Sequence, residues 1–306
     1  MKIKFIIILI TIILPLRTYA CDACGCSLGG NYFGILPLYN KNFVGLRWSQ
    51  AKFYAYMDHH SEYLPPEYSN DTYRKVELWG RFYINKRFQV FSFIPYAFNT
   101  MDGNEQKVSI NGLGDMTAMA NYLLFNTGED ETRKFKHTLL AGGGLKLPTG
   151  KFDTEDKGKL VNRNFQIGTG SLDFLLTSVY TIRYQRVGAN IEAGYKINTR
   201  NSNQYHFGNQ FNISSLFFYW QKVKSISFLP NAGVYYEQAA KHKDRGIIQA
   251  NTGGSALFAT AGLETYFKSF TVGLNYKHAM SQNYNSDNIA DIKSKDRWMI
   301  SLTYNF

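Results

Sequence analysis

The last residues of the chain alternate strictly between apolar and polar side chains. The apolar positions are Trp298, Ile300, Leu302, Tyr304 and Phe306, and a polar residue or methionine separates each from the next. Successive side chains of a β-strand point to opposite faces, so a period of two predicts a strand between two unlike environments. A soluble β-protein would place the apolar face in its core, whereas a membrane barrel would turn it towards lipid.

Strand-like patterns recur in about twelve stretches from Phe43 onward. These are 43–57, 72–84, 88–101, 111–125, 135–147, 165–182, 186–198, 206–219, 223–237, 254–267, 269–280 and 295–306. In the seventh, Ile191 and Ala193 share a face opposite Asn190 and Glu192. The pattern predicts an all-β, antiparallel protein.

The connections between these stretches alternate in length. The longer ones are 58–71, 102–110, 148–164, 199–205, 238–253 and 281–294, and the shorter ones are 85–87, 126–134, 184–185, 221–222 and 268. Bacterial membrane barrels have short periplasmic turns and longer outer loops, whereas a soluble sandwich has no reason to sort its loops in this way. We therefore predict a closed antiparallel transmembrane β-barrel of about 12 strands over residues 43–306, with both termini periplasmic and no strand edge facing lipid.

Residues 1–20 have the pattern of a secretory signal peptide. Two lysines precede an apolar run at 5–14, and small residues at positions 18 and 20 suit a cleavage site. A final strand that ends on Phe306 is similar to the C-terminal signal that assembly machinery reads in outer-membrane barrels. We therefore expect the outer membrane of a Gram-negative bacterium, with outer-membrane lipids and the barrel-assembly machinery as partners.

Composition agrees with a barrel and excludes other classes. Aromatic residues make up 16% of the chain, and such residues favour strands. The mean hydropathy is slightly negative, whereas a helical membrane protein needs several apolar runs of about twenty residues. The net charge of +11 is typical of nucleic-acid-binding proteins, but the chain contains no Lys/Arg-rich run. We expect no nucleic-acid partner, and assign the charge to a positive lumen or to contact with anionic lipid head groups.

The three cysteines, Cys21, Cys24 and Cys26, follow the signal peptide directly. Cys21 could be lipidated. Two of the thiols could form a disulfide, because the periplasm is oxidising. The C-x-x-C-x-C spacing could instead hold a soft metal ion such as Cu(I) or Zn(II), the one possible cofactor of the chain. These alternatives stay open, and we assign residues 21–42 to a cysteine-containing periplasmic segment.

Strand parity, meaning the alternation of side chains between the two faces of a strand, places a set of charged side chains in the lumen. A basic residue facing lipid costs about 2–4 kcal/mol at mid-membrane, so inward placement is favoured. The expected lumen-lining residues are Arg47, Glu77, Arg81, Asp115, Lys146, Asp173, Glu192, Lys196, Glu264 and Lys277. They would either line a pore and act on permeant ions or polar solutes, or form ion-pair networks that fill a closed barrel.

Three glycine-rich stretches follow one another in the chain: Gly-Leu-Gly-Asp at 112–115, Leu-Lys-Leu-Pro-Thr-Gly at 145–150 and Gly-Thr-Gly-Ser-Leu-Asp at 168–173. Glycine in strands marks bulges, kinks or close backbone approach, so these stretches predict one narrowed or sharply curved wall. Over about residues 110–200 they resemble the family of outer-membrane transporters named for the phenol meta-cleavage pathway. The resemblance implies a monomeric barrel that moves small molecules across the outer membrane, without naming a phenolic solute. The cysteine cluster is not part of that family's pattern.

The expected function is passage of a small-molecule solute by passive or facilitated diffusion, without enzymatic activity. One alternative is a closed structural barrel that binds metal or a partner through Cys21–Cys26. Another is an outer-membrane hydrolase, because His59 and Ser61 have the His-x-Ser spacing of outer-membrane phospholipases. No obvious third member of a catalytic triad lies near that pair.

Overall fold

The computed structural model describes residues 35, 41–58, 65–128, 130, 132–284 and 290–306. Regular secondary structure in this part of the chain is entirely β. Over the same residues, no helix is long and apolar enough to cross a bilayer.

Twelve strands form the wall when β4 and β5 are counted as one interrupted strand. The wall strands are β1 (Phe43–Met57), β2 (Glu67–Tyr83), β3 (Phe88–Gly103), β4 (Lys107–Leu113), β5 (Thr117–Asn126), β6 (Phe135–Lys146), β9 (Asp173–Tyr184), β10 (Val187–Ile197), β12 (Gln210–Tyr219), β14 (Ile226–Ala239), β17 (Gly254–Phe267), β18 (Phe270–Asn283) and β19 (Ala290–Asn305). The short strands are β7 (Glu155–Asp156), β8 (Lys159–Leu160), β11 (Tyr205–His206), β13 (Gln221–Val223), β15 (Lys243–Asp244) and β16 (Ile247–Ile248). All neighbouring strands are antiparallel, and the pairing of β12 with β14 and of β1 with β19 closes the ring. The predicted closed 12-strand barrel is confirmed.

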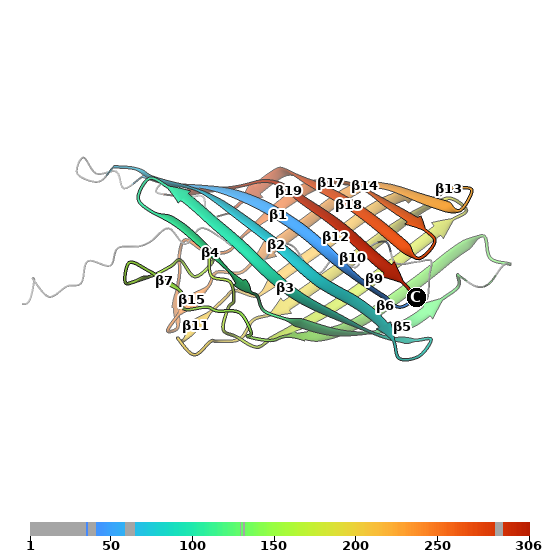
Figure 1. The fold of residues 1–306 in the computed structure, drawn as a ribbon, viewed down its shortest axis with the longest axis horizontal. Coiled ribbons are helices and arrows are strands. Elements are labelled where there is room, and N and C mark those ends of the chain that lie inside the picture. Colours follow the sequence, from blue (N-terminus) through green and yellow to red (C-terminus); the bar gives the residue numbers. More distant parts are fainter. Residues whose placement is uncertain (1–34, 36–40, 59–64, 129, 131, 285–289) are drawn as a thin grey trace, which may run out of the picture.

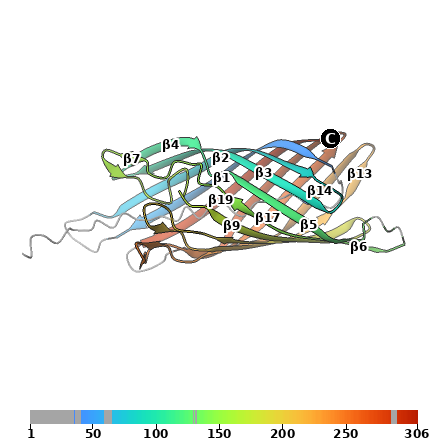
Figure 2. The same cartoon turned by 90° about the horizontal axis from the view of Figure 1, so that it is seen from below.

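The strands run at a slant to the long axis of the barrel (Figure 1), and the view from below shows the same slanted wall (Figure 2). Phe43 of β1 pairs with Asn305 of β19, so the wall begins and ends at one end of the barrel. We call this the turn end, because its connections are mostly short: 84–87, 127–134, 185–186, 220–225 and 268–269. The opposite, loop end carries the connections 58–66, 104–106, 147–172, 198–209, 240–253 and 284–289.

At the loop end, the predicted bounds of two segments are wrong. Residues 102–110 form no long loop, because β3 and β4 continue as a hairpin and leave only 104–106 between them. The predicted strand 165–182 begins only at Asp173, because 165–172 belongs to the long connection and Phe165 is fully buried inside the barrel.

Two further predicted strands are interrupted or shorter. The stretch 111–125 breaks at 114–116, where the Gly114 N–H donates to the Pro95 carbonyl at 2.8 Å. The wall strand predicted at 206–219 begins at Gln210, since Tyr205 and His206 pair with β15 instead.

The outward face of the wall is apolar. The five apolar residues of the last strand are 42–54% exposed, whereas Arg297 and Thr303 between them are only 6% and 5% exposed. Val44, Leu46 and Leu78 are exposed on neighbouring strands in the same way. An apolar outer band around a closed barrel is the arrangement that lipid requires.

The aromatic residues near strand ends do not all face outward. Trp298 faces outward, but Trp79 is 6% exposed and packs inside the barrel against Phe43 and Phe93. Tyr266 also points inward, where its hydroxyl donates to the Ile35 carbonyl at 3.3 Å. The alternation of side chains along the strand therefore places these two residues in the lumen.

The lumen is packed with apolar side chains towards the turn end. One cluster comprises Phe43, Trp79, Phe91, Phe93, Met119, Leu140 and Val179. A second comprises Ile35, Leu216, Phe218 and Leu229. Each of these residues is at most 6% exposed, so side chains fill much of this half of the barrel.

Ile300→Arg is expected to destabilise the barrel by about 2–4 kcal/mol in lipid, because it places a cation on the outward face in mid-strand. Ile247, on the β15–β16 hairpin, is a matched control because it is also exposed, at 60% against 48% for Ile300, but lies beyond the wall strands. Urea unfolding in lipid vesicles measures both variants. Equal costs for Ile300→Arg and Ile247→Arg would contradict lipid contact at Ile300.

Candidate functional site

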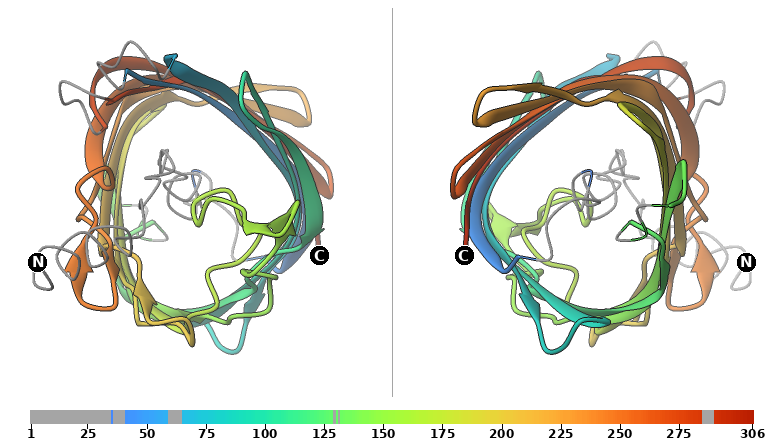
Figure 3. Two further views of the ribbon diagram at one scale, coloured as in Figure 1. Left: turned by 90° about the vertical axis from the view of Figure 1, so that its left-hand side faces the viewer. Right: turned by 90° about the vertical axis from the view of Figure 1, so that its right-hand side faces the viewer.

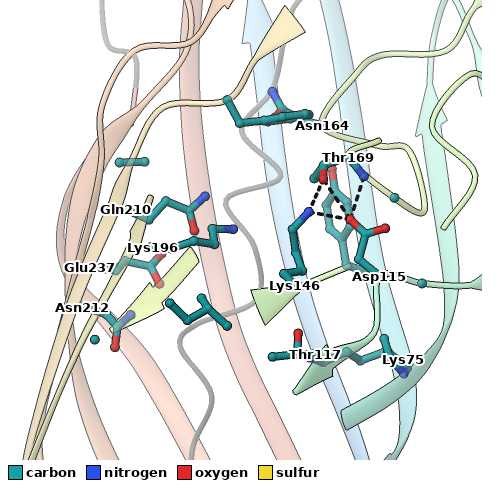
Figure 4. Close-up of a pocket in the computed structure, with 18 of the residues that line it drawn as sticks. Lys75, Asp115, Thr117, Lys146, Asn164, Thr169, Lys196, Gln210, Asn212 and Glu237 are labelled. Carbon is teal, nitrogen blue, oxygen red and sulfur yellow. Dashed lines mark hydrogen bonds and ion pairs between the residues drawn. The ribbon is translucent and has the colours of Figure 1, made fainter. Parts of the chain in front are cut away.

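A cavity of about 280 Å³ lies inside the barrel, towards the loop end. Side chains of β2, β10, β12 and β14 and of residues 163–169 line it. Figure 4 shows Lys196, Gln210, Asn212 and Glu237 on one side and Asp115 and Lys146 on the other. We call this space the lumen cavity.

Asp115 joins the three glycine-rich stretches at the edge of the lumen cavity. Its carboxylate accepts hydrogen bonds from the backbone N–H groups of Gly150 and Thr169, each at 2.9 Å, and from the Thr169 hydroxyl. Lys146 Nζ lies 2.7 Å from Asp115 (Figure 4). It also lies 2.9 Å from a carboxylate oxygen of Asp173. One carboxylate thus links the break between β4 and β5, the end of β6 and the segment before β9.

Two of the glycines, Gly168 and Gly170, allow the three stretches to lie this close together, because neither position has room for a side chain. A Cβ on Gly168 would lie 2.3 Å from the Gly150 carbonyl oxygen, too close for any side chain. Gly170 has a φ of +69°, and a Cβ there would lie 2.6 Å from the ring of Phe152. The sequence signal of clustered glycines therefore corresponds to close backbone approach rather than to a flexible loop.

Residues 147–172, which we call the inward loop, bend into the barrel. Figure 3 shows this yellow-green segment inside the ring of strands from both ends. Phe165 is fully buried against Tyr73, with ring centroids 5.7 Å apart. Asn99 on β3 also donates to the Phe165 carbonyl at 3.0 Å. The inward loop therefore narrows the lumen from the loop end.

Glu77 is held by two cations at the wall of the lumen cavity. It pairs with Arg47 and, at 3.2 Å, with Lys75. The Arg47 guanidinium also lies over the Trp79 ring, 4.8 Å from its centroid. Such a desolvated cation–π contact adds to the ion pair, so Arg47 connects the charged region to the apolar turn-end cluster.

A second buried ion pair joins Glu237 on β14 to Arg297 on β19. Two guanidinium nitrogens lie 2.8 and 2.7 Å from the two carboxylate oxygens, and Tyr284 donates its hydroxyl to the same carboxylate. Arg297 also lies 4.3 Å from the Phe258 ring centroid. Glu237 and Arg297 are not among the ten lumen residues predicted from the sequence. Strand parity could have found both, since each shares its strand face with inward-pointing neighbours.

The ten predicted lumen residues fall into separate groups. Those at the lumen cavity are Glu77, Asp115, Lys146, Glu192 and Lys196. Asp173 lies behind Lys146, fully buried, and its other oxygen accepts the Thr199 N–H at 2.9 Å. Arg47 and Lys277 are beside the cavity-lining residues Glu77 and Tyr235, respectively.

The remaining two predicted residues hold the chain before β1 near the turn end. Arg81 donates to the Lys41 carbonyl at 2.9 Å. Glu264 accepts the Ile35 N–H at 2.9 Å. Their role is therefore to bind backbone rather than to face the lumen cavity.

The cysteines Cys21, Cys24 and Cys26 lie outside the described residues, as do His59 and Ser61. Within the described part, no group of three or more His, Cys, Asp or Glu residues is arranged to hold a metal ion. The metal and hydrolase alternatives therefore stay predictions.

His242, in the connection after β14, is buried among aromatic rings. Its Nδ1 lies 2.9 Å from the Tyr205 hydroxyl, and the Phe207 ring centroid is 5.1 Å away. Burial, followed by the nearby charges of Lys196 and His206, lowers the pKa of His242 to about 4. The neutral imidazole is therefore part of the packing between connections 198–209 and 240–253.

Acidification is expected to loosen these two connections. The folded pKa of His242 is below its usual value of 6.5, so its contribution is complete above pH 6.5 and is lost as pH falls towards 4. The full shift corresponds to about 3 kcal/mol. Hydrogen exchange over residues 198–209 and 240–253 at pH 7 and pH 4.5 measures the effect. His242→Phe should reduce this pH dependence, and an unchanged dependence in that variant would contradict the assignment.

Comparisons with known proteins relate the fold to membrane channels. No protein-family model matches the chain, so the resemblance to the phenol meta-cleavage family is not confirmed. No curated protein matches it either.

Solved structures match over most of the length. An outer-membrane channel from Pseudomonas putida F1 aligns with a TM-score of 0.64 and 11% identity, covering 91% of this chain and 100% of the channel. The β domain of a Bordetella autotransporter aligns with a TM-score of 0.49 and 10% identity, covering 86% of this chain and 99% of the domain. At such identities the first likeness is one of fold alone. The chain therefore has the fold of an outer-membrane β-barrel.

Proposed function

We propose that this protein is an outer-membrane channel that passes a small solute by passive or facilitated diffusion. The lumen cavity carries the proposal, because it is a space lined by charged and apolar side chains inside a closed wall whose outward face is apolar. Charged side chains that line such a space act directly on permeant solutes. The similar fold of the Pseudomonas putida F1 outer-membrane channel supports the same conclusion.

The path would lead from the loop end through the lumen cavity to the apolar half of the lumen. The inward loop restricts the first part, and the packed side chains around Trp79 and Leu216 restrict the second. Passage through this region requires those side chains to move apart, so we expect slow flux of small solutes rather than a wide aqueous pore. No part of the described chain suggests coupling to an energy source.

Swelling of proteoliposomes tests this function. Vesicles that contain the purified protein are placed in isotonic solutions of glycine, acetate or a disaccharide. Faster swelling with the smaller solutes than in protein-free vesicles is the expected result. Swelling no faster than in protein-free vesicles for every solute would contradict transport.

The packing at the turn end favours a second candidate function, a closed barrel that binds a partner or ligand. Ile35 is 1% exposed among Leu216, Phe218 and Leu229, and its backbone is bonded to Glu264 and Tyr266. A barrel filled in this way could serve as a rigid anchor for its cysteine-containing N-terminal segment. Ligand binding without flux would favour this candidate.

A further inference from the structure

Lys277 is a lumen cation whose charge has no direct carboxylate partner. It lies on β18, partly buried, with Nζ 3.4 Å from the centroid of the Tyr235 ring. Among the described residues, no carboxylate lies within ion-pair distance of this amine and no hydrogen bond satisfies it. A cation–π contact alone leaves the N–H donors of an ammonium group available.

Two cations that act on Lys277 already have carboxylate partners. Arg297 is its direct cross-strand neighbour, and it is occupied by Glu237. Arg47 also acts electrostatically on Lys277, and it is occupied by Glu77, while the more distant carboxylates of Glu237 and Glu192 act on Lys277 with the opposite sign. Like charges opposite each other on adjacent strands are destabilising, so this arrangement is costly unless a negative charge offsets it.

The charge balance of the lumen places an excess of positive charge at this point. Four cations of the lumen cavity, Lys75, Lys146, Arg163 and Lys196, match four carboxylates, those of Glu77, Asp115, Glu192 and Glu237. Arg74 is left out of this charge count, because its guanidinium donates to the side chain of Gln50 on the outward face of the wall.

Three further cations, Arg47, Lys277 and Arg297, lie against residues of this balanced lining, while the buried carboxylates of Asp173 and Asp71 add two negative charges. Three positive charges and two negative charges leave a net charge of +1. A low-dielectric wall focuses such a field into the lumen and attracts anions.

We propose that Lys277 is the anion-binding residue of the lumen and that the solute carried is a small organic anion. This inference rests on the proposed channel function and names its solute class. A carboxylate at Lys277 Nζ would be bound by the unpaired ammonium, while an apolar body would contact the ring of Tyr235, which lines the lumen cavity.

Ion selectivity in planar bilayers tests the proposal. The reversal potential in a KCl gradient should show that the wild-type protein passes chloride more readily than potassium. Lys277→Gln should lower the chloride-to-potassium permeability ratio by about twofold or more, because it removes the unpaired cation. Lys277→Arg should keep the wild-type ratio. Lys52→Gln is the matched control, because Lys52 is exposed on the outward face of β1 and should leave the ratio unchanged.

Benzoate binding, followed by isothermal titration calorimetry in detergent, tests the same site without flux. Wild type and Lys277→Arg should bind benzoate, and Lys277→Gln should bind it at least about tenfold more weakly. Heat-modifiable migration in gels verifies that each variant is a folded barrel.

The outcomes separate the two proposals. A wild-type protein that binds benzoate through Lys277 but gives no current would contradict the channel and keep the anion site. Cation selectivity in the wild type, or equal benzoate binding by wild type and Lys277→Gln, would overturn the anion site and leave the channel in place.

Discussion

Replacing Asp115 with alanine is expected to release the inward loop and raise the conductance of the barrel. The change removes the acceptor for Gly150 and Thr169 and leaves Lys146 with one carboxylate instead of two. Loss of several charge-assisted hydrogen bonds around a buried ammonium should cost about 3–5 kcal/mol. Urea unfolding measures this cost, and single-channel recording measures the conductance.

Asp102→Ala is the control for this experiment. Asp102 is also paired with a lysine, Lys107 at 2.9 Å, but its side chain is 70% exposed. A surface ion pair of this kind contributes about 0–1 kcal/mol, so little change in stability or conductance is expected. If Asp115→Ala and Asp102→Ala behave alike, Asp115 does not hold the inward loop in place.

Arg297→Ala is expected to be the most destabilising single change on β19. It leaves the Glu237 carboxylate buried with only the Tyr284 hydroxyl as a direct partner among the described groups. Breaking a buried ion pair from one side typically costs about 3–5 kcal/mol. The free energy of unfolding in urea gives the measurement.

A double variant separates the loss of the pair from the loss of packing. Glu237→Leu combined with Arg297→Met removes both charges and keeps most of the volume, so it should recover a large part of the stability. Lys293→Ala serves as the exposed control, because its pair with Asp291 has side chains that are 59% and 42% exposed. A double variant less stable than Arg297→Ala would contradict the buried-charge explanation.

The wall strands were predictable because each one separates lipid from lumen. The predicted bounds of the strands at 43–57 and 254–267 agree with β1 and β17. Alternation of apolar and polar residues is a local pattern, so a strand between lipid and lumen can be recognised without knowing its distant contacts. The same pattern misled at 165–172, where Phe165 and Ile167 alternate with polar residues but pack inside the barrel instead of extending a wall strand.

The site was less predictable, because parity gives the face of a strand but not the partner across the lumen. Lys146 and Asp173 were both expected to point inward, but their pairing depends on the register of β6 with β9. Arg297 and Glu237 lie on strands that are not adjacent, so their bidentate contact follows from barrel diameter and strand stagger. Among the described residues, Lys277 has no direct carboxylate partner because Arg297, opposite it on β19, binds Glu237.

Recording from purified protein in planar lipid bilayers tests the central claim most directly. The channel account predicts discrete current steps of small conductance, because the inward loop and the apolar turn-end packing restrict the lumen. The steps should become larger in Asp115→Ala. A folded wild-type barrel that shows no discrete steps at any voltage would contradict a solute path through the lumen.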